Sequence, residues 1–367
     1  MKSRRNWQRL PDRQAWLRSR WVDLAAAGDW ILWQFGHPEI SHATDVLHTT
    51  GESSDNGGYT VYADVVCRNA LLGLAEMADS IGDGERASRW RNRADRMKQA
   101  IGSQYIVSDA KYGRVWTLES AGWPHKSTVL GPLIFPADSN GFAPQDDSPD
   151  WRAVNEATYQ RLVDSYQPFG FYGQAMGYGQ GFVTQAALLL DRMRDATEML
   201  QWMAKQIHDP RFGSFIVPEG CEIDSTGRFW YRIGDLGNGV QEAEIIKALR
   251  IVIGVDDVHP NRLQFLPRMP YGWNEIAVNN YPIVFEHAGK THTAQLHFKL
   301  RRLGENMELE IASDKQLGPV TARLGPFPNR PHRSFIRVNG IHNEASAEHS
   351  GDSWWMRFSI AVGPDQY

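Results

Sequence analysis

The chain has 367 residues, two to three times the usual length of a domain, and can therefore bury a large core without disulfides or metals. Its formal net charge of −4 leaves no surplus of Lys and Arg, which argues against a nucleic-acid partner. Its two cysteines have no His or Cys neighbours at ligand spacing, so we expect no metal site and no disulfide framework.

The sequence also lacks the signatures of several other protein classes. No segment approaches the ~18 uninterrupted apolar residues of a membrane span, and residues 1–11 do not resemble a secretory signal. No phosphate loop, dinucleotide fingerprint or catalytic Ser or Cys signature is present. We therefore expect a soluble, cytoplasmic protein that needs no cofactor and binds no membrane.

Helical periodicity dominates the first two-thirds of the chain, where apolar residues recur at the spacing of one buried helix face. About seven such stripes occur, at Leu17–Ile31, Leu71–Ile81, Trp90–Ile101, Trp151–Leu162, Phe182–Leu190, Ala196–Ile207 and Ile245–Ile253. Short turns such as Gly82-Asp83-Gly84 and Asp191-Arg192-Met193 join consecutive helices. Because short turns make antiparallel neighbours, the sequence predicts a domain of helical hairpins.

Long loops rich in Gly, Pro and aromatic residues separate the predicted hairpins. They cover residues 105–147, 166–181 and 209–237. Loops of this length inside a compact domain usually carry function. We therefore look for site residues in these segments.

After Asp257 the pattern changes to a period of two. Apolar and polar residues alternate over Ala294–Leu300, Met307–Ile311 and Trp354–Ile360, and turn residues stand at 304–306 and 339–340. This pattern predicts a small antiparallel β-sandwich. We place the boundary at 256–262, which gives a helical-hairpin domain over 1–257 and a β-sandwich domain over 258–367.

Three carboxylates, Glu219, Glu222 and Asp224, stand together in the loop 214–224, and a run with Trp230 and Arg232 follows. A carboxylate enclosed by aromatic rings is poorly solvated, which raises its pKa and suits it to proton transfer at neutral pH. Hydrolysis of a glycosidic bond usually takes two such groups on opposite sides of the sugar. The alternative interpretation is that these are solvated loop charges.

A second acidic loop, 51–59, stands immediately before the second predicted helix and contains Glu52 and Asp55. Carboxylates at the start of a helix often serve only as caps and as partners of the helix dipole. A glycine-flanked acidic loop before an inner helix can also present reactive groups. Both residues are therefore candidates for the second acid.

The loop 167–181 is uncharged and rich in rings, amides and glycines, and it includes Tyr172, Tyr178 and Gln180. Gln amides bond to sugar hydroxyls, aromatic rings stack on sugar faces, and glycine lets the backbone approach a ligand. Trp123 is a further candidate platform for a sugar ring. The alternative is that this loop only packs beneath the helices.

The order of three segments is similar to that of a known family. Gly234–Val240 opens the last predicted helix, Gly254-Val255-Asp256 follows its end, and Leu263–Trp273 is rich in Pro and aromatic residues. This order resembles the C-terminal half of the six-hairpin glycosidase superfamily, and within it looks most like the α-L-rhamnosidase-type enzymes. The resemblance implies an (α/α) toroid with a central acidic cleft and inversion at the anomeric carbon.

The resemblance also implies roles for the acidic residues. Glu219 stands where the late catalytic carboxylate of the family is expected, with Glu222 as the near alternative. The early catalytic acid is expected in the stretch from Glu52 to Asp55. A complete six-hairpin toroid has about twelve helices, more than the periodicity of this chain predicts, so we expect a shortened barrel or one that lacks an N-terminal portion.

The leading hypothesis is a glycoside hydrolase acting on an oligo- or polysaccharide. Its sugar subsites are expected to be lined by Trp123, Tyr172, Tyr178, Gln180, Trp230 and Arg232. One alternative is a non-catalytic carbohydrate-binding protein built on a truncated toroid. Another is a polysaccharide lyase, which the acidic loops disfavour because lyases need a basic cleft around the uronate.

Overall fold

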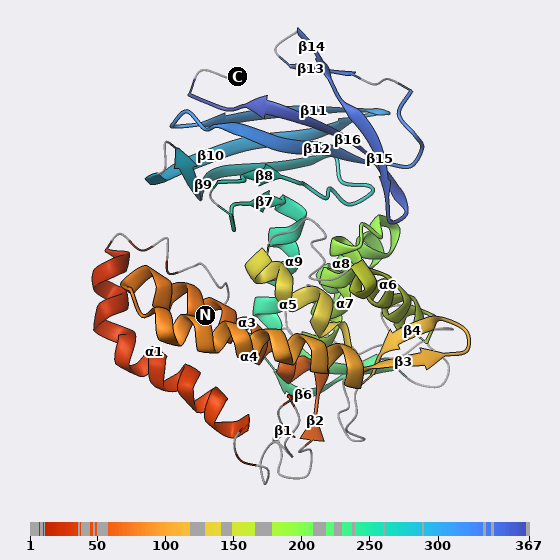
Figure 1. The fold of residues 1–367 in the computed structure, drawn as a ribbon. Helices are drawn as coiled ribbons and strands as arrows, with labels where there is room; N and C mark the ends of the chain where they lie inside the picture. The colour runs from red at the N-terminus through yellow and green to blue at the C-terminus, as the bar shows by residue number, and fades with distance from the viewer. Residues whose placement is uncertain are drawn as a thin grey trace. The chain divides into compact units, whose positions relative to one another are not determined.

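The computed structural model describes most of the chain (Figure 1). The described residues are 7, 10, 12–35, 37, 45–46, 48–49, 58–117, 129–140, 149–165, 178–207, 218–223, 230–236, 239–259, 261–287, 290–332, 335–338 and 341–364. The chain forms two compact units, Met1–Ser139 with Asp146–Ser165 (unit 1) and Asn140–Gln145 with Tyr166–Tyr367 (unit 2). None of the described helices is both long and apolar enough to cross a bilayer.

Unit 1 is mainly helical. Its helices are α1 (Arg13–Phe35), α3 (Val61–Ile81), α4 (Gly84–Gln104), α5 (Gly131–Asn140, with its last residue in unit 2) and α6 (Pro149–Asp164). Two short hairpins complete the described part of the unit, β1 (His48–Thr49) with β2 (Gly58–Tyr59) and β3 (Ile106–Asp109) with β4 (Gly113–Trp116).

The apolar stripes of α1, α3 and α4 form the core of unit 1, as the sequence predicts. Trp90 of α4 is fully buried and meets the Trp21 ring of α1 edge-on, with the ring centroids 5.8 Å apart. The predicted turn between α3 and α4 is also confirmed. Gly82 ends α3 with a φ of 88°, and the Asp83 side chain caps α4 by accepting a backbone hydrogen bond.

The segment 105–147, which the sequence pattern predicts to be a loop, contains the β3–β4 hairpin and α5. Helix α5 is short and contains Pro136, so it has little periodicity to detect. The hairpin is held by α6, because the backbone N–H of Trp116 donates to Thr158 Oγ1 over 2.8 Å and its indole N–H donates to Asn155 Oδ1 over 2.7 Å. Contacts this far apart leave no local signal in the sequence.

Unit 2 combines helices with the β strands. Its described helices are α7 (Tyr178–Leu189), α8 (Met193–Ile207) and α9 (Gly239–Ile253). A hairpin of β5 (Pro218–Ile223) and β6 (Trp230–Leu236) stands between α8 and α9 in the sequence, within the segment 209–237 that was expected to be a loop.

Helix α9 buries only part of the face that its apolar residues predict. Leu249 is 39% exposed, whereas the buried face runs through Glu244, Ala248 and Val252. Gly181 of α7 explains this choice, because a Cβ atom there would lie 2.5 Å from the Cβ atom of Glu244. The close approach of two backbones, permitted by a glycine, outweighs the local apolar pattern.

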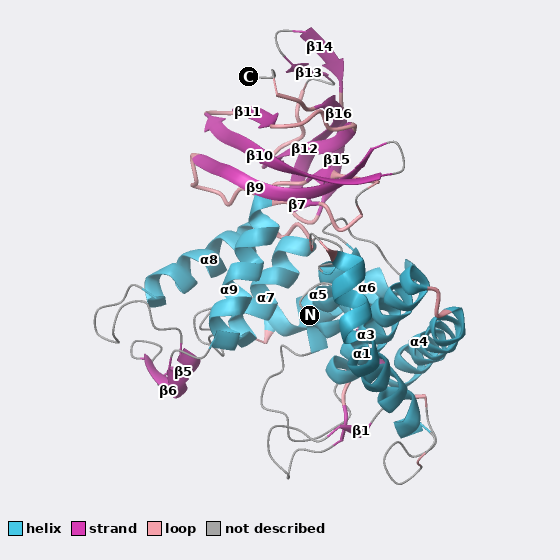
Figure 2. Ribbon diagram, turned by 90° about the vertical axis from the view of Figure 1, so that its left-hand side faces the viewer, coloured by secondary structure: helices cyan, strands magenta, loops and turns pink. Residues whose placement is uncertain are grey.

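Most of the remaining strands form two sheets (Figure 2). One has the order β11-β10-β9 and the other β15-β16-β12-β8-β7. The bounds are β7 (Val255–Asp256), β8 (Gln264–Phe265), β9 (Glu275–His287), β10 (Lys290–Leu303), β11 (Asn306–Ser313), β12 (Pro319–Phe327), β13 (Phe335–Val338), β14 (Ile341–Glu344), β15 (Ser346–Ser350) and β16 (Ser353–Ala361). Strands β13 and β14 form a separate hairpin.

The period-two pattern is confirmed in these strands. The inward positions of β10, from Ala294 to Leu300, are buried, and the Phe298 ring meets Phe265 of the other sheet with centroids 4.6 Å apart. Gly304 makes the predicted turn into β11 with a φ of 64°, while the predicted turn at 339–340 lies outside the described residues.

The sheets are antiparallel, as the sequence predicts, apart from one short pair of strands. Strands β8 and β12 pair in parallel, whereas the other described strand pairs are antiparallel. The strands β9, β10 and β11 come between β8 and β12 in the sequence, so no tight turn forces these two strands to run in opposite directions.

The helical part and the β module are therefore both present. The boundary between the two compact units does not fall at residue 257, however. Helices α7, α8 and α9 are grouped with the β strands in unit 2. The domains 1–257 and 258–367 stay a prediction.

Candidate functional site

Four of the predicted site residues come together in the β5–β6 hairpin of unit 2. Strand β5 carries Glu219 and Glu222, and strand β6 carries Trp230 and Arg232. The two strands pair antiparallel along most of their length. The β5–β6 hairpin thus carries two candidate catalytic carboxylates and two candidate sugar-binding residues, one aromatic and one cationic.

The register of the hairpin separates the two glutamates. Successive residues of a strand belong to alternate faces, so Glu219 and Glu222, three positions apart, belong to opposite faces. Trp230 pairs with Ile223 and Arg232 pairs with Cys221. These two β5 residues lie two and four positions from Glu219, on the same face of the strand. Glu219, Trp230 and Arg232 therefore occupy positions on the same face of the hairpin.

A β-bulge lies at the position of Glu219. Pro218 pairs with Leu236 and Gly220 pairs with Ile233, so the single residue Glu219 stands opposite two residues of β6. The extra residue of the bulge thus belongs to β6, opposite Glu219, and bulges are over-represented next to active sites. The irregularity distinguishes Glu219 from Glu222, which stands in regular pairing with Tyr231.

The candidates from the amide-rich loop fall at the start of α7. Tyr178 is the first residue of the helix and Gln180 is the third. The Gln180 side chain is buried, and its Oε1 atom has no hydrogen-bond partner among the described residues. A buried acceptor without a donor is unfavourable, so Gln180 Oε1 is suited to accept a hydrogen bond from a bound hydroxyl group.

The other predicted site residues lie outside the described residues. They are Glu52, Asp55, Trp123 and Tyr172. Their roles stay predictions, including the position of the early catalytic acid.

A buried acidic residue that sequence reasoning did not single out lies in α9. Glu244 accepts a hydrogen bond from Gln185 Nε2 of α7 over 2.6 Å, and its other carboxylate oxygen lies 2.6 Å from Lys247 Nζ. The sequence feature that could have indicated its burial is its spacing, because Glu244 stands four residues before Ala248 on the buried face of α9. With both oxygens bonded, Glu244 links α7 to α9.

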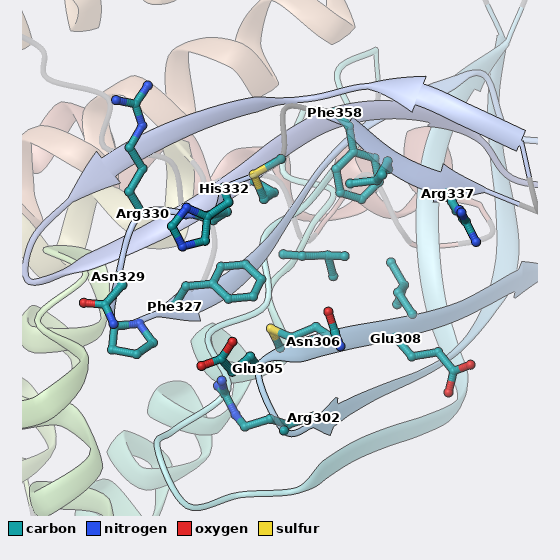
Figure 3. Close-up of a pocket in the computed structure, with 18 of the residues that line it drawn as sticks. Arg302, Glu305, Asn306, Glu308, Phe327, Asn329, Arg330, His332, Arg337 and Phe358 are labelled. Atoms are coloured by element: carbon teal, nitrogen blue, oxygen red, sulfur yellow. The ribbon is translucent and has the colours of Figure 1, made fainter.

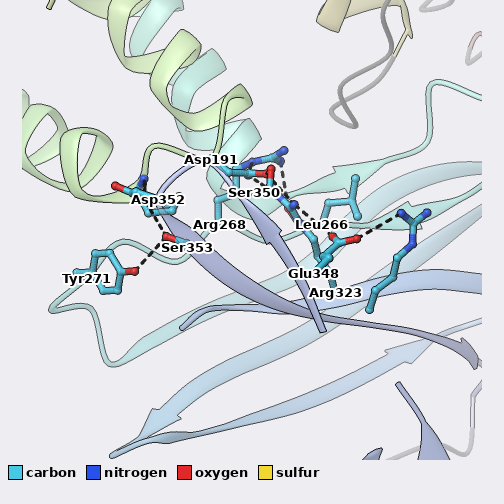
Figure 4. A network of polar contacts seen from close by, with 11 residues as sticks. Asp191, Leu266, Arg268, Tyr271, Arg323, Glu348, Ser350, Asp352 and Ser353 are labelled. Atoms are coloured by element: carbon cyan, nitrogen blue, oxygen red, sulfur yellow. Dashed lines mark hydrogen bonds and ion pairs between the residues drawn. The ribbon is translucent and has the colours of Figure 1, made fainter. Parts of the chain in front are cut away.

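A second buried carboxylate, Asp191, lies in the turn between α7 and α8 (Figure 4). Burial favours its neutral form, but Arg323 and Arg268 outweigh burial and lower the pKa of Asp191 to about 2. Arg268 Nε donates to Asp191 Oδ1 over 2.9 Å. A carboxylate this acidic does not take up a proton at neutral pH, so Asp191 is a structural residue rather than a general acid.

Unit 1 contains a third buried carboxylate, Asp64 of α3. It accepts a hydrogen bond from the Tyr105 hydroxyl over 2.6 Å. Burial, together with the charge of Asp64, raises the pKa of the Cys67 thiol to about 12. Because only a thiolate is an effective nucleophile, Cys67 is not suited to covalent catalysis at neutral pH.

Comparison with known proteins gives a likeness in fold. No protein-family model and no curated protein matches the sequence. Among solved structures, the chain is similar to an α-L-rhamnosidase from Aspergillus terreus (TM-score 0.43, 13% identity) and to one from Dictyoglomus thermophilum (TM-score 0.47, 11% identity). The alignments cover 82% of this chain in both cases, but only 30% and 31% of those chains. The resemblance to α-L-rhamnosidases that the sequence predicts is thus found among solved structures, for a part of their length.

Proposed function

We propose that this chain belongs to a glycoside hydrolase that cleaves an oligo- or polysaccharide by paired-carboxylate catalysis with inversion. In this proposal the helices are part of an (α/α) toroid and the two sheets of unit 2 form a β-sandwich. The substrate is a carbohydrate, and Glu219 is one of the two catalytic carboxylates.

One observation supports the choice of Glu219 above the others. It shares a face of the β5–β6 hairpin with Trp230 and Arg232, whereas Glu222 belongs to the opposite face. An aromatic residue beside a carboxylate can stack on the sugar ring and reduce solvation of the carboxylate, and a cation can bond the sugar hydroxyls.

The proposed reaction needs a second carboxylate on the other side of the sugar, for which Glu52 and Asp55 are the candidates. In an inverting reaction one carboxylic acid protonates the leaving oxygen, while the other carboxylate activates a water molecule on the opposite face of the sugar. The two groups then stand about 6.5–9.5 Å apart, which leaves room for the water. The buried Oε1 atom of Gln180 is proposed to accept a hydrogen bond from a substrate hydroxyl.

The test compares two isosteric variants on one strand. Hydrolysis of a panel of aryl glycosides, rhamnosides included, is measured for the wild type, Glu219→Gln and Glu222→Gln. We expect Glu219→Gln to lower kcat at least a thousandfold with an unchanged circular dichroism spectrum, and Glu222→Gln to retain activity within about threefold. Normal turnover by Glu219→Gln would refute the assignment.

A second candidate function is sugar binding without catalysis. The described residues contain eight helices, fewer than the about twelve of a complete six-hairpin toroid. This candidate predicts oligosaccharide binding by calorimetry in the wild type and in Glu219→Gln, with no hydrolysis by either protein. Hydrolysis by the wild type excludes it.

A further inference from the structure

The β module of unit 2 contains a cavity of about 1150 Å³ that the proposed glycosidase chemistry does not use (Figure 3). Its walls come from both sheets, with β11 on one side and β12 and β16 on the other, and β13 contributes Ile336. Known small-molecule sites have volumes of about 300–1,000 Å³. The cavity is therefore large enough for a small organic ligand.

The body of the cavity is apolar. From β11 it is lined by Met307, Leu309 and Ile311, which are alternate residues on one face of the strand. Across the cavity stand apolar residues of β12 and β16, namely Leu324, Phe327, Met356, Phe358 and Ile360. These apolar side chains offer no hydrogen-bond partners to the hydroxyl groups of a sugar, so this part of the wall favours hydrocarbon. The rest of the lining is polar or charged and includes Glu308, Glu310, Arg330, His332 and Arg337.

One charged side chain in the wall is poorly compensated. Arg302 stands on the inward face of β10, and both of its terminal nitrogens donate to the carbonyl oxygen of Pro326 over 3.2 Å. Its Nε atom is buried without a hydrogen-bond partner, and among the described residues no carboxylate forms an ion pair with Arg302. A guanidinium has five N–H donors, so each terminal nitrogen of Arg302 keeps one N–H for an anion, while the buried Nε is out of reach. The guanidinium carbon lies 5.9 Å from the centroid of the Tyr271 ring.

The neighbouring residue Arg301 shows the contrast. It belongs to the outward face of β10, where its side chain forms ion pairs with Glu275, Glu308 and Glu310. The carboxylates that line the outer edge of β11 are thus already engaged by Arg301. The exposed Glu305 lies next to Arg302 in Figure 3, but no ion pair between these two side chains is present in the part of the chain that the structure describes.

We propose that this cavity binds an amphipathic anion, a molecule with a hydrocarbon body and one terminal carboxylate. The carboxylate receives hydrogen bonds from the Arg302 guanidinium, and the hydrocarbon lies along Leu309 and Phe358. The anion supplies the counter-charge that Arg302 lacks, and the hydrocarbon fills an apolar space between the two sheets.

The probe is dodecanoate, kept below its critical micelle concentration, and dodecanol is its uncharged analogue. Binding to the full chain is measured by isothermal titration calorimetry. We expect one dodecanoate per chain, with an affinity at least tenfold higher than that of dodecanol. Equal affinities for the two compounds, or no binding of dodecanoate, would overturn the proposal.

Three variants locate the binding. Arg302→Gln is expected to weaken dodecanoate binding at least tenfold. The control Arg357→Gln, at an exposed position of β16 that does not line the cavity, is expected to leave it unchanged. Leu309→Trp fills the cavity and is expected to weaken both ligands at least tenfold without removing any charge, which keeps the test decisive if Arg302→Gln fails to fold. Dodecanoate binding that Leu309→Trp does not change overturns the proposal. In a further outcome, the chain binds no dodecanoate but self-associates, and only Leu309→Trp abolishes the self-association. The occupant would then be a second copy of the chain, and the proposal would be overturned.

Discussion

Asp191 and Arg323, 132 residues apart in the sequence, form a buried ion pair with two hydrogen bonds. The Arg323 guanidinium donates to one carboxylate oxygen of Asp191 over 2.8 Å and to the other over 2.5 Å. The Ser350 hydroxyl donates a further bond over 2.7 Å, and the guanidinium lies 3.8 Å from the centroid of the Trp355 ring. The Asp191 carboxylate thus joins the α7–α8 turn to β12 and β15, and Trp355 of β16 packs on the Arg323 guanidinium.

The backbone around Asp191 is equally constrained. Asp191 has a φ of 54°, and its carbonyl oxygen accepts a hydrogen bond from the N–H of Asp352 over 3.2 Å. A Cβ atom at Gly351 would lie 2.1 Å from that oxygen, so only glycine fits. The helices and the β strands of unit 2 therefore meet by direct backbone contact at this turn.

The first prediction concerns the charge of Asp191. Asn has the same shape and tolerates a positive φ. Asp191→Asn removes the charge and replaces one of two oxygens that accept hydrogen bonds by an NH2 group, which only donates. It leaves Arg268 and Arg323 buried without their main counter-charge, and we expect a loss of about 3–5 kcal/mol in the free energy of unfolding. Urea unfolding followed by tryptophan fluorescence measures this loss.

The control for Asp191→Asn is a weaker partner of the same arginine. Glu348 Oε1 lies 3.9 Å from Arg323, and a third of the Glu348 side chain is exposed. We expect Glu348→Gln to change the free energy of unfolding by less than about 1 kcal/mol. Equal losses in the two variants would show that Asp191 has no special role.

The second prediction is the pH dependence of this ion pair. Asp191 has a pKa of about 2 in the folded chain, below the value of about 3.9 expected for an unfolded Asp. Its contribution to stability is therefore complete above about pH 4 and is lost as the pH falls towards 2. The difference in unfolding free energy between the wild type and Asp191→Asn, measured from pH 5 to pH 2, should shrink over this range. A constant difference contradicts the assignment.

The third prediction concerns the cap at the start of α8, which Asp352 supplies from the turn between β15 and β16. The Asp352 carboxylate accepts hydrogen bonds from the backbone N–H groups of Met193 and Arg194 over 2.9 and 3.0 Å, at the start of α8. We expect Asp352→Ala to lower the free energy of unfolding by about 1 kcal/mol, as for other N-caps. Because the Asp352 and Asp191 side chains both fix the same α7–α8 turn, the losses in the double variant with Asp191→Asn should not be additive, which a double-mutant cycle measures. Strict additivity contradicts coupling at this turn.

The fourth prediction tests the close packing of α7 on α9. Gly181→Ala would place a Cβ atom 2.5 Å from that of Glu244, so we expect a loss of about 1–3 kcal/mol through overpacking. Gly84→Ala, at the first residue of α4, meets no atom within 4 Å and should be neutral or slightly stabilising. Thermal unfolding of both variants measures the contrast, and a neutral Gly181→Ala would show that α7 and α9 can separate without loss.

Part of the candidate site could be predicted from residue types alone. Carboxylates, rings and amides in long loops pointed to Glu219, Trp230, Arg232 and Gln180. Local sequence could not choose between Glu219 and Glu222, because the choice depends on the register of β5 against β6. Sequence reasoning also missed Glu244. Its only signal was a spacing of four residues from Ala248, and the burial of this face becomes clear only when the partner helix α7 is known.

The sequence by itself determined the elements whose pattern repeats locally. The stripe from Trp90 to Ile101 became the buried face of α4, and the alternation from Ala294 to Leu300 became the inward face of β10. Burial of one face imposes a period of 3.6 or 2 on the chain, so these elements can be read without knowing their partners.

Only the tertiary structure decided which distant groups meet. The turn at Asp191 was predictable, but its partners Arg268, Arg323 and Ser350 lie 77 to 159 residues further along the chain. The same holds for the face that α9 buries, which Gly181 of another helix selects. Hydrogen bonds, ion pairs and close backbone approach depend on positions in space, and a local sequence pattern carries no information on which residues far along the chain will occupy them.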